Sequence, residues 1–81
     1  MQFEAKYWGK VGVGSTNSEL IVAELALYPT CFFVEMTLYI CSGMNNYQFR
    51  PISYSDGGKL MFYRPFPYPI EVGADYIIGR D

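Results

Sequence analysis

The stretch "YQFRPISYSDGGKLMFYR" (residues 47–64) decides the fold class, because it contains two strand-like runs joined by a tight turn. Asp-Gly and Gly-Gly steps tolerate the positive φ angles of hairpin turns, so Ser55–Gly58 predicts a β-hairpin. Tyr47–Tyr54 is expected to form its first strand, and the run that begins at Lys59 its second. Pro51 has no N–H for a ladder hydrogen bond, which predicts that the first strand lies at a sheet edge or bulges there.

The preceding run, "CFFVEMTLYIC" (Cys31–Cys41), predicts a long strand with one wholly apolar face. The side chains expected to point into the core are Phe32, Val34, Met36, Leu38 and Ile40. At the rise of a strand the two cysteines stand about 33 Å apart, whereas a disulfide needs Cα atoms within about 7 Å. We therefore expect both cysteines to be free thiols, buried as small apolar side chains, in a reducing compartment.

The remaining segments add further short strands. "QFEAKY" alternates polar and apolar residues, which predicts a half-buried strand with Phe3, Ala5 and Tyr7 on one face. Gly9–Ser18 is rich in glycine and small polar residues and indicates a loop.

Glu19–Tyr28 fits either a strand or a helix. Ser18 and the Ala, Leu and Glu content favour a helix, whereas the strands expected on both sides favour a strand. With "YIIG" near the end of the chain as a last strand, residues 1–81 are expected to form a single all-β domain. The regular turn signals predict a small antiparallel β-barrel or sandwich of six to seven short strands.

Three prolines alternate with larger side chains in "RPFPYPI" (residues 64–70). Proline fixes φ and favours extended structure in the residue before it, so this segment is expected to be a stiff crossing between two strands. Aromatic residues and arginine are favoured at the centres of protein interfaces. We expect a docking segment on one edge of the barrel, whose contact residues are Tyr63, Arg64, Phe66 and Tyr68. The alternative is that Phe66 and Tyr68 fill the core of the domain.

The composition bears on partners. Hydrophobic residues make up 51% of the chain and aromatic residues 19%, which is much for a domain whose small size limits its interior. The apolar excess favours an interface with other chains, so a homo-oligomer is expected. The net charge is −2 and the basic residues are scattered, which makes a nucleic-acid partner an unlikely class. No apolar stretch is long enough to span a membrane, and the first residues do not have the pattern of a signal peptide.

The chain contains no histidine, which removes the commonest general base and the commonest metal ligand. The glycine-rich stretch "GKVGVGST" resembles a phosphate-binding loop in its spacing, but Ser15 stands where that loop needs lysine. Glu24 and Glu35 lie in apolar surroundings, although glutamates on strands more often face solvent or pair with a cation. We therefore expect no enzyme activity, no cofactor and no metal.

From about Cys31 to Ile78 the chain resembles a small β-domain found in tail-hub and tail-tip assembly proteins of tailed phages. The resemblance rests on the order of several pieces: "CFFVEMTLYI", Ser42-Gly43-Met44-Asn45, Arg50 followed by Ile52, Asp56-Gly57-Gly58, the proline-flanked Phe66, Val72-Gly73, and Asp75-Tyr76 before an Ile-rich strand. A Gly-Asp dipeptide is usual before the last strand of such domains, whereas here Ala74 intervenes.

The resemblance implies a non-enzymatic structural virion protein that docks onto neighbouring subunits. Its place would be the tail, the head–tail connector or the capsid surface as a decoration protein, and its partners would be other virion proteins. It would be synthesised in the cytoplasm of the bacterial host and end in the virion. Two other functions remain open: a small phage-encoded inhibitor that binds a host defence protein, and a small ligand- or nucleotide-binding barrel.

Overall fold

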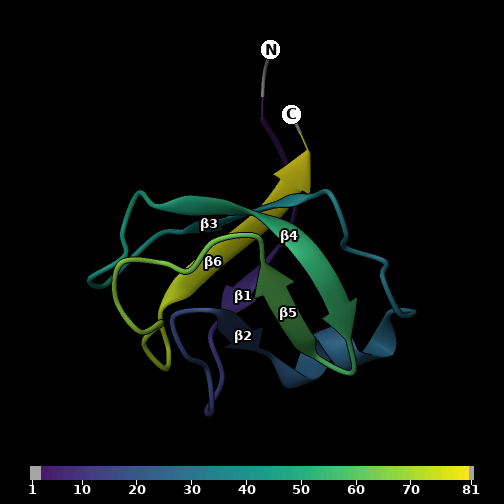
Figure 1. Cartoon of the computed structure of the whole chain (residues 1–81), viewed down its shortest axis with the longest axis horizontal. Coiled ribbons are helices and arrows are strands. Elements are labelled where there is room, and N and C mark those ends of the chain that lie inside the picture. The colour runs from purple at the N-terminus through teal and green to yellow at the C-terminus, as the bar shows by residue number, and fades with distance from the viewer. Residues whose placement is uncertain (1–2, 81) are drawn as a thin grey trace.

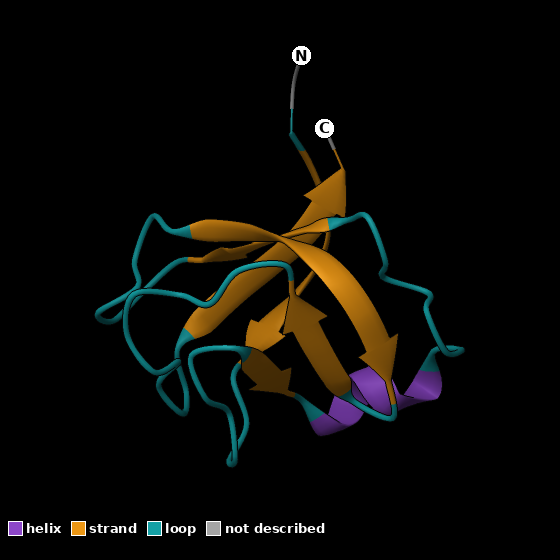
Figure 2. Cartoon of the chain, in the orientation of Figure 1, coloured by secondary structure: helices purple, strands orange, loops and turns teal. Residues whose placement is uncertain are grey.

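The computed structural model describes residues 3–80 of the chain (Figure 1). Its elements are β1 (Glu4–Lys10), β2 (Glu19–Ile21), the 3₁₀ helix η1 (Ala23–Leu27), β3 (Thr37–Ile40), β4 (Phe49–Asp56), β5 (Lys59–Phe62) and β6 (Asp75–Arg80). The helix is the purple segment of Figure 2 and lies beside the turn between β4 and β5. Within residues 3–80 no helix is long and apolar enough to cross a membrane.

The six strands form one antiparallel sheet in the order β1-β6-β3-β4-β5-β2. Strand β4 is long and curved, so that residues 49–51 pair with β3 and residues 52–56 pair with β5 (Figure 1). The two ends of the sheet approach each other just after β1, where the N–H of Gly12 donates to the carbonyl of Ile21 in β2 at 2.8 Å. The predicted small all-β domain with antiparallel strands is confirmed, and its shape is barrel-like.

The core lies between the two halves of this folded sheet. Alternate residues of each strand point inward, as the register of β6, β3 and β4 requires. The most deeply buried side chains are Leu20, Val22, Phe33, Leu38, Ile40, Ile52, Leu60, Phe66 and Ile78. They come from five of the six strands and from three of the connecting segments, so the core is shared by the whole chain.

The hairpin prediction is confirmed in detail. The turn between β4 and β5 consists of Gly57 and Gly58, whose φ angles are 56° and 85°. The prediction for Pro51 is wrong about the edge, because β4 lies between β3 and β5. The N–H of Ile52 donates to Met36, on the β3 side, so the proline nitrogen faces the other side, where pairing with β5 begins only at Ile52. A register shift in the β4–β5 pairing follows directly after this point.

The long strand predicted over Cys31–Cys41 is only partly present. Strand β3 covers Thr37–Ile40, and residues 31–35 form turns in which Cys31 and Glu35 have φ angles of 65° and 71°. These turns change the direction of the side chains, so Phe33 is buried and Phe32 is exposed. The assignment of the core face is therefore right for Met36, Leu38 and Ile40, all buried, and wrong for the exposed Phe32, while Val34 is only half-buried.

Both cysteines are free, as predicted, but neither is buried. Cys31 is exposed because it lies in a turn, and Cys41 is exposed because it follows the last residue of β3. The pKa of the Cys41 thiol is raised by desolvation and by the nearby carboxylate of Asp75. A raised pKa lowers the thiolate fraction at neutral pH and with it the reactivity of this sulfur.

The ambiguous segment Glu19–Tyr28 contains both predicted structures. Its first residues form the short strand β2, and its second half forms η1. In β1 the expected alternation is interrupted, because the pairing with β6 shifts between Ala5 and Tyr7. As a result Tyr7 points inward, where its ring contacts that of Phe33 at 5.2 Å, whereas Ala5 is exposed on the other face.

Candidate functional site: an exposed apolar surface around Trp8

The proline segment of residues 64–70 crosses from β5 to β6 without forming a strand, as predicted. Its backbone is held at both ends by the loop between β1 and β2. The N–H of Phe66 donates to the carbonyl of Asn17 at 2.7 Å, and the N–H of Ile70 donates to that of Thr16 at 3.3 Å. The guanidinium of Arg50 donates to the carbonyl of Pro65 at 3.1 Å. These contacts fix the segment on the body of the domain.

The four contact residues predicted on this segment do not form one surface. Phe66 is 1% exposed and packs edge-on against Phe62, so its ring fills the core, and its prediction as a contact residue is wrong. Tyr63, Arg64 and Tyr68 are exposed. The hydroxyl of Tyr63 donates to the carboxylate of Glu35, which raises the pKa of this tyrosine. A contact role for the three exposed residues stays a prediction.

A different surface carries a row of apolar side chains that are exposed at its two ends and half-buried in the middle. The register places Trp8 of β1 opposite Ile77 of β6, Ile77 opposite Tyr39 of β3, and Tyr39 opposite Phe49 of β4. The side chains on both sides of Ile77 and Tyr39 are buried and Tyr7 points inward, so Trp8, Ile77 and Tyr39 lie on the solvent side of the sheet, and Phe49 stacks on Tyr39 on that side. We call these four residues the apolar row, and the solvent side of β1, β6, β3 and the first half of β4 the outer face.

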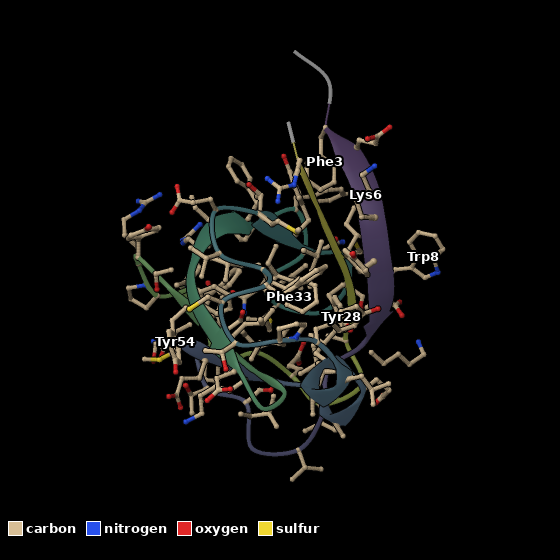
Figure 3. All side chains as sticks on the ribbon, turned by 90° about the vertical axis from the view of Figure 1, so that its right-hand side faces the viewer. Phe3, Lys6, Trp8, Tyr28, Phe33 and Tyr54 are labelled. Carbon is tan, nitrogen blue, oxygen red and sulfur yellow. The ribbon has the colours of Figure 1, made fainter. Side chains whose placement is uncertain are left out.

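Two rings of the apolar row contact each other. Tyr39 and Phe49 are stacked, with centroids 5.0 Å apart and planes at 26°. Phe3 adds a third ring, 4.4 Å from Tyr39 and nearly edge-on to it. Trp8 is 70% exposed and Phe49 49% exposed, so the two ends of the row are the most accessible. In Figure 3 the side chain of Trp8 points away from the body of the molecule.

One hollow of the surface lies on the outer face beside Trp8. Its volume is about 420 Å³, and its lining includes Trp8, Ile77 and Cys41. The ammonium of Lys10 and the carboxylate of Asp75 form an ion pair of 2.6 Å at the same hollow. Both ends of this pair are largely exposed, so it contributes little to stability and leaves the hollow without net charge. The hollow is therefore suited to an apolar group of a partner.

A second hollow, which we call the edge pocket, lies between β1 and η1 and has a volume of about 330 Å³. Strand β1 pairs only with β6, so the pocket borders the free edge of the sheet. Its lining includes Tyr7, Trp8, Glu24, Leu25, Tyr28 and Tyr76. Trp8 lines both hollows, and this makes it the centre of the candidate site.

The ring of Tyr76 lies against Gly9 of β1, which has no side chain, and this lets Tyr76 line the edge pocket. A Cβ atom at Gly9 would lie 3.0 Å from the hydroxyl oxygen of Tyr76, so a larger residue would crowd this ring. The pKa of Tyr76 is raised, first by desolvation and then by the charge of Glu24 and by Tyr28. The hydroxyl therefore stays protonated at neutral pH.

Sequence reasoning missed this site because it did not consider Trp8. Strand alternation alone places Trp8 on the face opposite to its neighbour Tyr7, but the row that Trp8 forms with Ile77 and Tyr39 depends on the pairing of distant strands. One signal was present in the sequence: the only tryptophan of the chain stands between two lysines, Lys6 and Lys10, in a strand that alternates. Tryptophan is among the residues most enriched at the energetic centres of protein interfaces.

Comparisons with protein-family models, with curated proteins and with solved structures found no match to this chain. Among residues 3–80 no group of three or more His, Cys, Asp or Glu side chains is placed to hold a metal ion. The arguments about function therefore rest on the geometry of the surface around Trp8.

Proposed function

We propose that the chain is a non-enzymatic binding module that docks onto neighbouring protein subunits through its outer face. The observation that carries the proposal is the apolar row, which crosses four strands and ends in a tryptophan that is 70% exposed. Contiguous exposed apolar patches are uncommon on monomeric proteins and mark interaction sites. Tryptophan and tyrosine are also the side chains that contribute most often to the free energy of binding in interfaces.

The partners we propose are other subunits of a tailed-phage particle, including further copies of this chain. Support comes from the resemblance over Cys31–Ile78 to the small β-domain of tail-hub and tail-tip assembly proteins. The outer face is formed largely by strands within this region, β3, β4 and β6. The proposed role is a structural component of the virion, in the tail, at the head–tail connector or on the capsid surface.

Mass spectrometry of purified particles of the phage that encodes the chain tests the virion role directly. The protein should be present in intact particles in a fixed ratio to known structural subunits. Its absence from intact particles, together with expression in infected cells, would contradict the virion role.

A charge placed on the outer face tests the docking surface. Phe49→Lys should reduce incorporation into particles at least about tenfold, because a buried hot-spot aromatic typically contributes about 2 kcal/mol or more. Tyr54→Lys is the matched control, since Tyr54 is similarly exposed but pairs with Met61 of β5, away from the row. Equal incorporation of the two variants would contradict the role of the apolar row.

A further inference from the structure

We propose that the edge pocket binds an arginine side chain of the partner protein, with Glu24 as the counter-ion and the rings of Tyr7 and Tyr28 beside the guanidinium. The inference rests on the proposed function in one respect, namely that the arginine belongs to a protein partner. It adds the chemistry of the contact: one cationic side chain enters beside Trp8, while apolar groups cover the outer face.

The charges of the pocket favour a cation. Among residues 3–80 the ion pairs join Lys6 to Glu4, Lys10 to Asp75 and Lys59 to Glu19, and none involves Glu24. The one lysine in the lining, Lys6, forms an exposed ion pair with Glu4 at 2.8 Å. Glu24 is thus the charged residue of the lining that takes part in no ion pair among residues 3–80.

The rings of the pocket also favour a cation. A guanidinium or ammonium over the face of tryptophan or tyrosine is attracted by the negative charge density of the ring, and the attraction grows when water is excluded. Four aromatic residues contribute to the lining, from β1, from the end of η1 and from β6. In Figure 3 Trp8 projects outward from β1, whereas Tyr28 lies against the body of the domain.

Arginine fits this lining better than lysine. A guanidinium has five N–H donors and a flat, weakly hydrated surface that stacks on aromatic rings, whereas an ammonium is compact and strongly hydrated. The tyrosine hydroxyls and the Glu24 carboxylate are acceptors for those donors. A volume of about 330 Å³ lies at the lower end of the range for small-ligand sites, about 300–1,000 Å³, and suits a single side chain.

The experiment is an NMR titration of the protein with the peptide acetyl-Gly-Arg-Gly-amide, followed at the indole N–H of Trp8. The matched probe is the same peptide with citrulline, which keeps the shape of arginine but carries no charge. We expect saturable shifts with the arginine peptide and affinity at least about tenfold lower for citrulline. The Glu24→Gln variant should lose a similar factor, whereas Glu35→Gln, a change at an exposed carboxylate elsewhere, should bind like the wild type.

Equal affinity for the arginine and citrulline peptides, or unchanged affinity in Glu24→Gln, would overturn the proposal. Tighter binding of acetyl-Gly-Lys-Gly-amide would overturn the choice of arginine. The fingerprint spectrum of each variant shows whether it is folded. This titration uses the isolated protein and no particle. Failure of arginine binding would therefore leave the virion role untouched, and absence from particles would leave arginine binding untouched.

Discussion

At the scale of single residues, Asn45 illustrates how one buried polar side chain positions a distant segment. It is 2% exposed, and both the nitrogen and the oxygen of its side-chain amide bind the backbone of Tyr68. The Nδ2 group donates to the carbonyl of Tyr68 at 2.8 Å, and the N–H of Tyr68 donates to Oδ1 at 3.1 Å. Because prolines on both sides of Tyr68 leave few backbone donors, this side chain supplies the hydrogen bonds that a neighbouring strand would otherwise provide.

We expect Asn45→Ala to lower the free energy of unfolding by about 2 kcal/mol, since two hydrogen bonds of about 1 kcal/mol each are lost in a buried place. Urea denaturation measures this change. Asn46→Ala is the control, because the neighbouring residue makes no side-chain hydrogen bond within residues 3–80, and its effect should stay below about 0.5 kcal/mol. Similar losses in the two variants would show that Asn45 does not hold the segment.

At the scale of elements, the sequence predicted correctly those elements whose conformation depends on the residues within them. The β4–β5 hairpin was predictable because its two-residue turn needs positive φ and the sequence has glycine at both positions. The turns at residues 31–35 were not, since Cys31 and Glu35 adopt positive φ although neither is glycine, asparagine or aspartate. Their conformation depends on long-range hydrogen bonds, from the N–H of Cys31 to Ser55 and from that of Glu35 to Ile52.

The candidate site was less predictable than the fold for the same reason. The apolar row exists only because three strand pairings place residues far apart in the sequence side by side. Tyr39 and Phe49 lay in predicted strands, but which residues would stand opposite each other depends on register, and register depends on the whole sheet. Phe66 was misassigned because its exposure is decided by the loop and by Arg50, which covers its ring at 5.0 Å.

The two ends of the sheet meet where the N–H of Gly12 donates to the carbonyl of Ile21, and we call this contact the seam. The close approach of the two backbones there leads to a prediction about Gly12. A Cβ atom at Gly12 would lie 2.7 Å from the carbonyl oxygen of Ile21, closer than real contacts allow. We expect Gly12→Ala to destabilise the domain by about 1–3 kcal/mol, because the backbone must shift to relieve this overlap. Amide hydrogen exchange should become faster at residue 12, whose N–H donates across the seam.

Gly57→Ala is the comparison for this variant. Gly57 has a positive φ of 56° but open space around its Cβ position, so its replacement should cost stability through conformation alone. In Gly57→Ala, hydrogen exchange at the N–H of Gly12 should become faster only as much as the overall loss of stability explains. If Gly12→Ala left that amide as protected as before, the seam would not depend on the close approach.

At the scale of the whole molecule, the apolar excess of the chain is found on the surface. The accessible surface of the chain is 4819 Å², and a folded monomer of 9.3 kDa is expected to expose about 5,000 Å². The domain is therefore about as compact as an ordinary monomer of its mass. We expect it to fold without a second chain, which leaves the exposed aromatic side chains available for binding.

A chain that folds without a partner should have a stability that does not depend on protein concentration. We expect the isolated domain to unfold cooperatively at a Tm that does not change between about 1 and 100 µM protein, since folding and association are separate steps. An obligate dimer would gain about 2.7 kcal/mol over the same range, by the mass-action relation for a hundredfold change, and its Tm would rise by at least about 5 °C. Phe49→Lys should melt like the wild type, because its side chain lies outside the core. A Tm that rises with concentration, together with a lower Tm for Phe49→Lys, would mean that the outer face is part of the folding unit, and the apolar row would then be a core completed by a second copy.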